Sequence, residues 1–194
     1  EQVRDMAARA LAWKGRIDVL VNNAGGGSGR SEGDLFRRSS DDIAALIATN
    51  LTGSLLCCKE VAPAMAERGS GKIINIASIA GLVGRDRRMY HRNDRREQPV
   101  DYAAAKAGVI GMTYDLAACL APKGVHVNCI SPGGFDKGEL PPGFVRDFAD
   151  EAMLGRMGRI GVDLKGAVLF LASSASDYVT GHNLVVDGGF SRFK

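Results

Sequence analysis

Short apolar segments alternate with longer amphipathic stretches along this chain, and that alternation limits the folds it can adopt. The predicted strands are residues 17–21, 72–77, 124–130 and 184–187. The predicted helices are residues 2–13, 41–67, 101–121 and 163–173, with a short one at 144–151. The strands are nearly all apolar, which is typical of parallel strands buried on both faces. Strands separated by helices therefore predict an α/β fold with three layers, in which helices cover both faces of a parallel sheet.

Composition narrows the class of protein further. The 194 residues, 45% of them apolar and 24% charged, suit one globular domain spanning residues 1–194. The net charge of +3 is small and dispersed, so it does not indicate a nucleic-acid partner. No apolar run has the length of a membrane span and no secretory signal is visible, so we expect a cytoplasmic protein with no membrane partner. The four cysteines are expected to be buried, reduced thiols, and the scattered histidines His91, His126 and His182 predict no metal site.

Tyr102 and Lys106 are the residues most suggestive of chemistry. They lie four positions apart in an Ala-rich segment with helical character, so both side chains emerge on one face, about one turn apart. A cation beside a phenol favours the phenolate, and this predicts that Lys106 moves the pKa of Tyr102 from about 10 towards neutrality. Such a phenol can exchange a proton with a substrate oxygen. On its own the spacing also occurs in solvated helix faces, so the interpretation depends on the surrounding residues.

Five further motifs flank this pair in a fixed order. They are Val-Leu-Val-Asn-Asn-Ala-Gly at 19–25, Thr-Asn-Leu-Thr-Gly at 49–53, Ile-Ile-Asn-Ile-Ala-Ser at 73–78, Val-Asn-Cys-Ile-Ser-Pro-Gly at 127–133, and Thr-Gly-His-Asn-Leu-Val-Val-Asp-Gly-Gly at 180–189. Together with the Tyr-Lys pair they resemble the short-chain dehydrogenase/reductase family over nearly the whole chain. The resemblance implies a Rossmann-like, doubly wound parallel sheet and an NAD(P)-dependent oxidoreductase of the alcohol/carbonyl type.

The phosphate-binding glycine loop of such folds is not found in this sequence. Doubly wound dinucleotide folds carry it after their first strand, whereas the glycine-rich residues 25–29 lack its spacing. The segment 17–21 also has the character of a central strand that needs neighbours on both sides. We therefore expect the N-terminal βα units of the fold to be missing from this sequence.

The resemblance implies four catalytic residues. Tyr102 would be the general acid/base, and Lys106 would also hold the nicotinamide ribose hydroxyls. Ser78 would orient the substrate oxygen from a strand end, which is where open α/β sheets place their sites. Asn50 would bind a water that relays protons to Lys106.

The same resemblance implies the cofactor, which would be NAD or NADP. The predicted cofactor-binding residues are Asn22, Ala24, Gly25, Tyr102, Lys106, Pro132 and Gly133. Gly25 is expected to allow close approach of backbone to the ligand, because it has no side chain.

Residues 84–99 form an insertion between Ser78 and Tyr102 that is longer than the family's usual loop. It contains six arginines, Arg85, Arg87, Arg88, Arg92, Arg95 and Arg96. Guanidinium groups bind carboxylates and phosphates, so the insertion favours an anionic small-molecule substrate such as a sugar acid or a nucleotide sugar. A solvated surface loop or a subunit contact is the alternative.

The sequence thus predicts hydride transfer to or from a sugar acid, polyol or nucleotide sugar, in a branch that resembles gluconate 5-dehydrogenases and glycan-modifying oxidoreductases. The resemblance also implies that residues 135–160 form a substrate lid and that the helices at 41–67 and 101–121 build a homotetramer or homodimer interface. Two alternatives stay open: a 3-oxoacyl-carrier-protein reductase, and a non-catalytic binding or regulatory relative without a working dinucleotide site. Nucleic-acid binding through the arginines is a weaker alternative, for which steep salt dependence would be expected.

Overall fold

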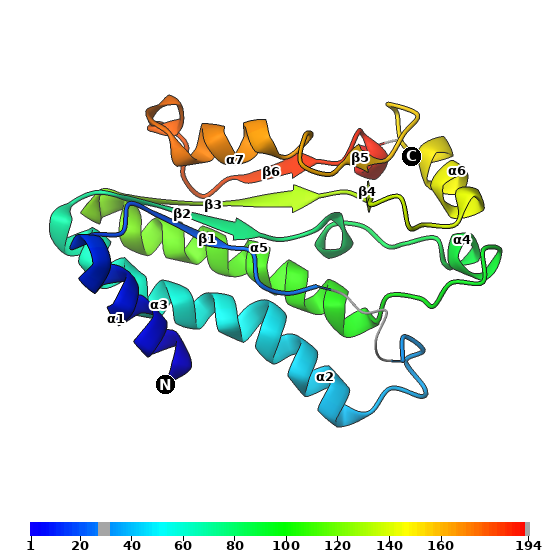
Figure 1. Ribbon diagram of the computed structural model, residues 1–194, viewed down its shortest axis with the longest axis horizontal. Coiled ribbons are helices and arrows are strands. Elements are labelled where there is room, and N and C mark those ends of the chain that lie inside the picture. Colours follow the sequence, from blue (N-terminus) through cyan, green and yellow to red (C-terminus); the bar gives the residue numbers. More distant parts are fainter. Residues whose placement is uncertain (27–31, 193–194) are drawn as a thin grey trace.

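A computed structural model of the chain describes residues 1–26 and 32–192 (Figure 1). The main sheet has four parallel strands in the order β1-β2-β3-β6. The strands are β1 Val19–Asn22, β2 Gly71–Ile76, β3 Val125–Pro132 and β6 Asn183–Val186. Parallel neighbours need crossover connections, and helices lie between each pair along the chain. The predicted α/β class is therefore confirmed.

Helices cover both faces of this sheet (Figure 1). On one face lie α1 (Gln2–Lys14), α3 (Gly53–Arg68) and α5 (Val100–Leu120), and on the other lies α7 (Lys165–Ala172). Successive side chains of β2 point to opposite faces of the sheet, as the two-residue period of a strand requires, and so pack against different helical layers. Ile73 packs with the α1 and α3 side, and Ile74 packs with α7.

The long predicted helix at 41–67 consists of three parts. Helix α2 (Ser40–Ile47) begins at the N-cap Ser39, whose side chain accepts a hydrogen bond from the Asp42 amide. A π-helical turn, Ala48–Thr52, then leads into α3. Single π turns within helices are frequent at functional sites, and this one contains the predicted site residue Asn50.

Strand β1 lies at one edge of the described sheet. It pairs with β2, and among the described residues no strand pairs with its other side. Val21 of this strand is 41% exposed. The glycine-rich residues 25–29 lie partly outside the described residues, so nothing follows about their conformation as a loop.

The insertion at 84–99 contains a short helix, α4 (Arg87–His91), which the sequence did not predict. It packs against α6 (Pro142–Asp150), and the side chain of Asn93 donates to Asp147 of that helix at 2.8 Å. Two short strands of two residues each, β4 (Phe135–Asp136) and β5 (Gly158–Arg159), pair as a second, small parallel sheet next to α6. Figure 1 shows α4 and α6 side by side beyond the ends of the main strands. The remaining short helices are 3₁₀ turns at Ile79–Gly81, Ala121–Lys123, Ser174–Ser176 and Phe190–Arg192.

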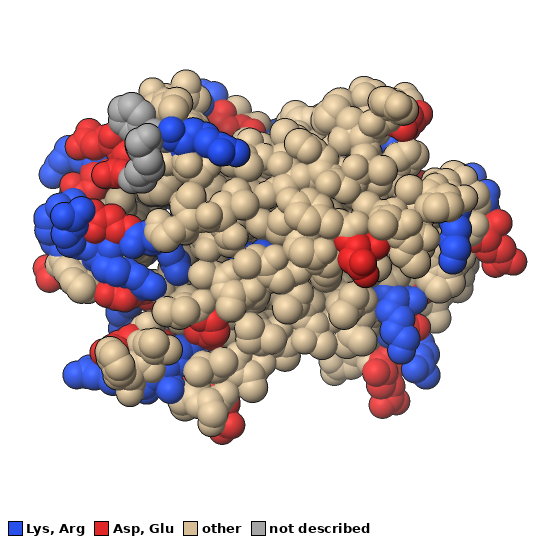
Figure 2. Space-filling model, turned by 180° about the vertical axis from the view of Figure 1, so that it is seen from behind, with Lys and Arg blue, Asp and Glu red and all other residues tan. Residues whose placement is uncertain are grey.

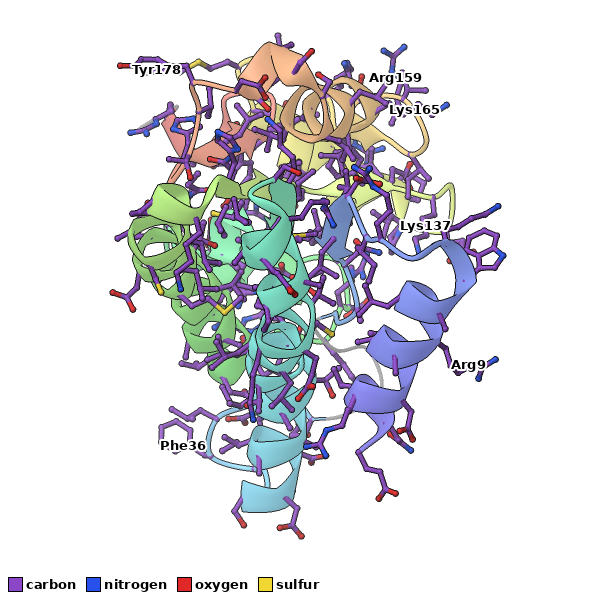
Figure 3. All side chains as sticks on the ribbon, turned by 90° about the vertical axis from the view of Figure 1, so that its left-hand side faces the viewer. Arg9, Phe36, Lys137, Arg159, Lys165 and Tyr178 are labelled. Atoms are coloured by element: carbon purple, nitrogen blue, oxygen red, sulfur yellow. The ribbon has the colours of Figure 1, made fainter. Side chains whose placement is uncertain are left out.

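The surface carries mixed charge. Figure 2 shows Lys and Arg intermixed with Asp and Glu at the end of the molecule that carries α4 and α6, beside a broad uncharged face. Phe36 and Tyr178 project from the body of the protein (Figure 3) and are almost fully exposed. Cys119 is exposed, so the expectation of uniformly buried thiols is wrong at that position. None of the helices in the described part of the chain is both long and apolar enough to span a bilayer.

Candidate active site

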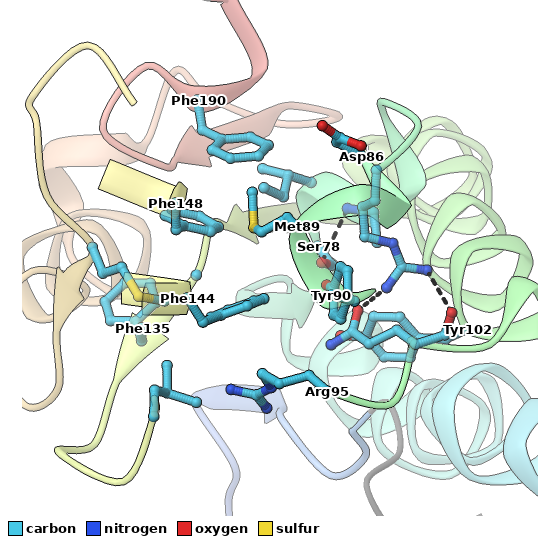
Figure 4. A pocket seen from close by; sticks show the side chains of 18 of the residues that line it. Ser78, Asp86, Met89, Tyr90, Arg95, Tyr102, Phe135, Phe144, Phe148 and Phe190 are labelled. Atoms are coloured by element: carbon cyan, nitrogen blue, oxygen red, sulfur yellow. Dashed lines mark hydrogen bonds between the residues drawn. The ribbon is translucent and has the colours of Figure 1, made fainter. Parts of the chain in front are cut away.

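A cavity of about 290 Å³ opens beyond the carboxyl ends of the central strands. Ser78, two residues after β2, and Tyr102, in the first turn of α5, both line it. Figure 4 shows these two side chains on one side of the cavity, with Phe135, Phe144 and Phe148 on the other. The structure therefore brings together the two hydroxyls that the sequence predicted to meet. Ligand sites of open α/β sheets lie at the same edge.

Ser78 has a local structural role as well as a place in the cavity. Its backbone is extended, and its hydroxyl accepts a hydrogen bond from the amide of Ala80 at 3.1 Å, which caps the 3₁₀ turn at Ile79–Gly81. A serine hydroxyl keeps one donor and a further acceptor position after accepting one bond. Ser78 can therefore cap this turn and still bind a substrate oxygen.

Lys106 is buried one helical turn beyond Tyr102. Its ammonium donates to the backbone carbonyl of Ile76 at 2.8 Å and lies 5.7 Å from the centre of the Tyr102 ring. Burial lowers the pKa of Lys106 to about 8. An ammonium has three donors, and one of them has an acceptor among residues 1–26 and 32–192, so two are unassigned there.

The pKa of Tyr102 departs from the sequence-based prediction. Burial raises it above its ordinary value, and a hydrogen bond with Ser78 and the charge of Arg85 lower it only in part. The expected acidification by Lys106 is therefore wrong for this structure. The physical reason is that desolvation of the phenol dominates, while the Lys106 ammonium is directed at the carbonyl of Ile76.

Asn50 is buried in the π-helical turn, and its side chain forms hydrogen bonds with the loop after β1. Its side-chain oxygen accepts from the Gly26 amide at 2.9 Å, and its side-chain nitrogen donates to the carbonyls of Gly26 and Leu46 at 3.1 Å each. Gly25 has φ of 134°, and a Cβ there would lie 2.5 Å from the Asn50 side-chain oxygen. The loop can thus approach Asn50 closely because residue 25 is a glycine. The predicted water relay through Asn50 stays a prediction.

The other predicted cofactor residues are Asn22 and Ala24 near the end of β1 and Pro132 and Gly133 at the end of β3. The Asn22 side chain is buried and donates to Asn75 at 2.8 Å and to the Cys58 sulfur at 3.2 Å, so it ties β1 to β2 and α3. Ala24 is exposed in the loop after β1. Pro132 ends β3, and Gly133 lines the cavity. All these positions lie at the carboxyl ends of β1 and β3, the edge at which Tyr102 and Lys106 also lie.

These features fit a nicotinamide nucleotide. The two unassigned donors of Lys106 suit ribose hydroxyls, and Gly25 presents backbone without a side chain at the same sheet edge. The geometry combines two hydroxyls that can bind and protonate a substrate oxygen with a buried amine one turn away. Such an arrangement suits proton exchange with a carbonyl or hydroxyl group.

Sequence reasoning missed the inner surface of the cavity. Tyr90 of α4 is buried against Phe144, with ring centres 5.2 Å apart. Phe190, far along the chain, stacks on Phe148 at 4.4 Å. The length of the insertion was the available signal for Tyr90. For Phe190 the sequence offered none, because the fold alone brings it to the cavity.

Comparison with known proteins defines the family. A family model described as enoyl-(acyl carrier protein) reductase matches residues 1–191. The chain is 40% identical to nodulation protein G of Azospirillum brasilense, covering 98% of this chain and 73% of that protein. It is 36% identical to the 3-oxoacyl-[acyl-carrier-protein] reductase FabG of Chlamydia pneumoniae, covering 97% and 71%.

Solved structures agree in fold. A short chain dehydrogenase from Leptospira borgpetersenii with bound NAD+ superposes with a TM-score of 0.87 at 35% identity, covering 97% of this chain and 70% of that one. A gluconate 5-dehydrogenase from Burkholderia cenocepacia in complex with NADP and tartrate gives 0.85 at 35% identity, covering 98% and 71%. The chain belongs to the short-chain dehydrogenase/reductase family, a class of NAD(P)-dependent oxidoreductases. It spans 70% to 73% of the length of these four proteins.

Proposed function

We propose that this chain transfers hydride between the nicotinamide of NAD or NADP and a secondary alcohol or ketone. The observation that carries the proposal is the shared cavity of Ser78 and Tyr102, with Lys106 one turn away on α5. Neighbours of the same fold with bound NAD+ and NADP support the choice of cofactor.

The roles of the residues follow from their donors. The cofactor, when bound, supplies or accepts the hydride. In the reducing direction the Ser78 hydroxyl donates a hydrogen bond to the carbonyl oxygen, and the Tyr102 hydroxyl gives its proton to the oxygen as negative charge develops there. In the oxidising direction Tyr102 takes the proton from the alcohol. Hydride and proton together convert the ketone to the alcohol, so the step balances.

Lys106 and Asn50 act around this centre. Lys106 is fixed by the Ile76 carbonyl. Its remaining N–H groups would hold the nicotinamide ribose and so orient the cofactor. Asn50 holds the loop after β1 at Gly26 and, as the family resemblance implies, orients a water that returns protons to Lys106. The cofactor would lie against the backbone of four residues, Ala24, Gly25, Pro132 and Gly133. Asn22 supports the sheet beneath them.

The substrate is an anionic carbonyl or hydroxy compound. Arg85, Arg95 and Arg96 of the insertion line the cavity, which supports the anionic character that the sequence predicted. The gluconate 5-dehydrogenase neighbour supports a sugar acid or polyol, and the acyl-carrier-protein reductase relatives support a 3-oxoacyl thioester. Phe144 and Phe148 of residues 135–160 also line the cavity, which supports the predicted lid role of that segment.

The chain would act as a homotetramer or homodimer built on residues 41–67 and 101–121. Leu55 and Leu56 of α3 and Tyr114 of α5 are 40% to 49% exposed, and large apolar side chains on a surface helix support burial between copies. Light scattering at several protein concentrations tests this. A monomer at every concentration contradicts it. The free cysteines support a cytoplasmic location.

A substrate panel tests the proposed reaction. Reduced-nicotinamide absorbance is followed with NAD and NADP against sugar acids, polyols, an acetoacetyl thioester and apolar ketones. Turnover that disappears in Tyr102→Phe supports the proposal, and preference for the thioester would identify a 3-oxoacyl reductase. Absence of turnover with every compound, together with absence of dinucleotide binding, would identify the non-catalytic relative and contradict the proposal.

A further inference from the structure

The cavity of Ser78 and Tyr102 is lined by two kinds of side chain. Most of the lining is apolar and aromatic, formed by Met89, Phe135, Leu140, Phe144, Phe148 and Phe190. The insertion adds three arginines, Arg85, Arg95 and Arg96, and Figure 4 shows Arg95 beside Phe144. The cavity volume of about 290 Å³ is many times the space that one water needs, so the cavity can admit a small organic ligand.

The arginines of the insertion differ in what they bind. Arg87, Arg88 and Arg92 form ion pairs with Glu97, Asp86 and Asp147. Arg85 lies on the cavity, but its guanidinium donates to the side chain and carbonyl of Gln98 and to the carbonyl of Pro99. These arginines therefore have protein acceptors already.

Arg95 is different. Its guanidinium lies over the Phe144 ring, 4.5 Å from the ring centre. One of its terminal nitrogens, Nη1, is buried and has no hydrogen-bond partner among the described residues. When a guanidinium lies on an aromatic face, its N–H groups point outward in the plane of the guanidinium. They can then donate hydrogen bonds to a planar anion such as a carboxylate. A buried donor without an acceptor is costly, so the described residues leave the hydrogen-bonding capacity of Arg95 incompletely used.

The backbone holds Arg95 in this place. Asp94, the residue before it, has φ of 49°, in the left-handed region that residues other than glycine rarely adopt. The turn is secured by the Arg95 amide, which donates to the Tyr90 carbonyl at 3.0 Å, and by Asn93, which donates to Met89 and Asp147. Backbone outliers of this kind concentrate at ligand sites, where surrounding contacts maintain them.

The residues that line the cavity around Arg95 carry a net positive charge, which favours an anionic ligand. Of the described residues that line the cavity, three are arginines and one, Asp86, is a carboxylate. Asp86 accepts from the amide and the guanidinium of Arg88, whose side chain is 81% exposed outside the cavity. The cavity therefore combines net positive charge with a largely apolar lining.

We propose that the substrate is an apolar keto or hydroxy acid, whose carboxylate binds Arg95 while its hydrocarbon part packs on Phe144 and Phe148 and its carbonyl faces Ser78 and Tyr102. This rests on the proposed function and names its substrate class. A planar carboxylate matches the free donors of one guanidinium, and the aromatic lining gives sugar hydroxyls few partners. Arg95 is thus the specificity-determining residue. Arg85, whose guanidinium already binds Gln98 and Pro99, and Arg96 add positive charge to the lining.

The test uses β-benzoylpropionate and its primary amide, which share a shape and differ in charge. Calorimetric binding without dinucleotide is expected to favour the acid over the amide by about ten-fold in the wild-type chain, the loss expected for one charged contact. Arg95→Met, which keeps an apolar stem over Phe144, should remove that preference, and Arg95→Lys should keep part of it. Arg88→Met is the matched control on the same insertion and should leave the preference unchanged.

Kinetics with a dinucleotide give the second readout. The ratio of kcat/KM for acid over amide should fall about ten-fold in Arg95→Met, and the change should lie in KM. Equal binding of acid and amide by the wild-type chain, or an equal effect of Arg88→Met, would overturn the assignment of Arg95. Tighter binding of a keto-sugar acid, or of the phosphonate analogue, would overturn the apolar keto acid. If the acid is preferred in calorimetry while no ketone is reduced, the proposed reaction fails and the anion site stands.

Discussion

Replacement of Lys106 by methionine is expected to change how the stability of the protein depends on pH. Lys106 is 4% exposed, and burial lowers its pKa from 10.5 to about 8. In the unfolded chain the amine keeps its proton to its ordinary pKa, whereas in the folded chain it releases the proton near pH 8. Between these values the unfolded state binds more protons, so the free energy of unfolding rises with pH.

The size of this effect follows from the shift. At about 1.4 kcal/mol per pKa unit, the buried charge costs the folded state on the order of 3 kcal/mol below pH 8. Most of the cost has disappeared at pH 10.5, where the folded state has released the proton and half of the unfolded chains have done so. The free energy of unfolding of the wild type minus that of Lys106→Met should therefore rise by about 3 kcal/mol between pH 7 and 10.5.

Urea unfolding at half-unit pH intervals measures this difference. Other groups titrate equally in both proteins, so their contributions cancel in the subtraction. Ile110→Val, on the same helix, removes no titratable group, and its difference from the wild type should stay constant with pH. A Lys106→Met difference that is equally flat, within the error of the extrapolation, would refute a lowered pKa and the buried-amine description of the site.

Two further predictions concern the framework that supports the site. Asn75→Leu should lower the free energy of unfolding by about 2 kcal/mol or more, because the buried Asn22 amide loses its acceptor at 2.8 Å. In a double-mutant cycle measured by urea unfolding, adding Asn22→Leu to the same chain should recover part of that loss. Additive effects of the two substitutions would contradict the coupling. Gly25→Ala should cost about 1–3 kcal/mol in thermal or urea unfolding, because φ is 134° and the new Cβ would meet the Asn50 oxygen at 2.5 Å. Gly26→Ala, whose Cβ would have nothing within 4 Å, is the matched control, and equal losses in the two variants would contradict the clash.

The main elements of the fold were predictable because their patterns are local. The apolar run at 72–77 became β2 (Gly71–Ile76), and the Ala-rich segment at 101–121 became α5 (Val100–Leu120). Tyr102 and Ser78 could also be placed together, because one follows a strand end and the other begins a helix at the same edge. Local period and connection rules are sufficient for such predictions.

What the sequence did not reveal depends on tertiary contacts. Helix α4 has an arginine-rich sequence without an apolar face long enough to signal a helix, and its buried side, Met89 and Tyr90, is defined only by packing against α6. The π-helical turn at Asn50 leaves no mark in the residue pattern. The raised pKa of Tyr102 reflects the burial of its hydroxyl, which a four-residue spacing does not report.

Tyr102→Phe tests the central claim, that the Tyr102 hydroxyl exchanges the proton during hydride transfer. Turnover and dinucleotide affinity are measured on one preparation, with Tyr90→Phe as the control because Tyr90 lines the same cavity. We expect turnover of Tyr102→Phe to fall by at least about 100-fold, the usual contribution of a general acid or base, with dinucleotide affinity unchanged. Wild-type turnover in Tyr102→Phe would contradict the account, as would an equal loss in Tyr90→Phe.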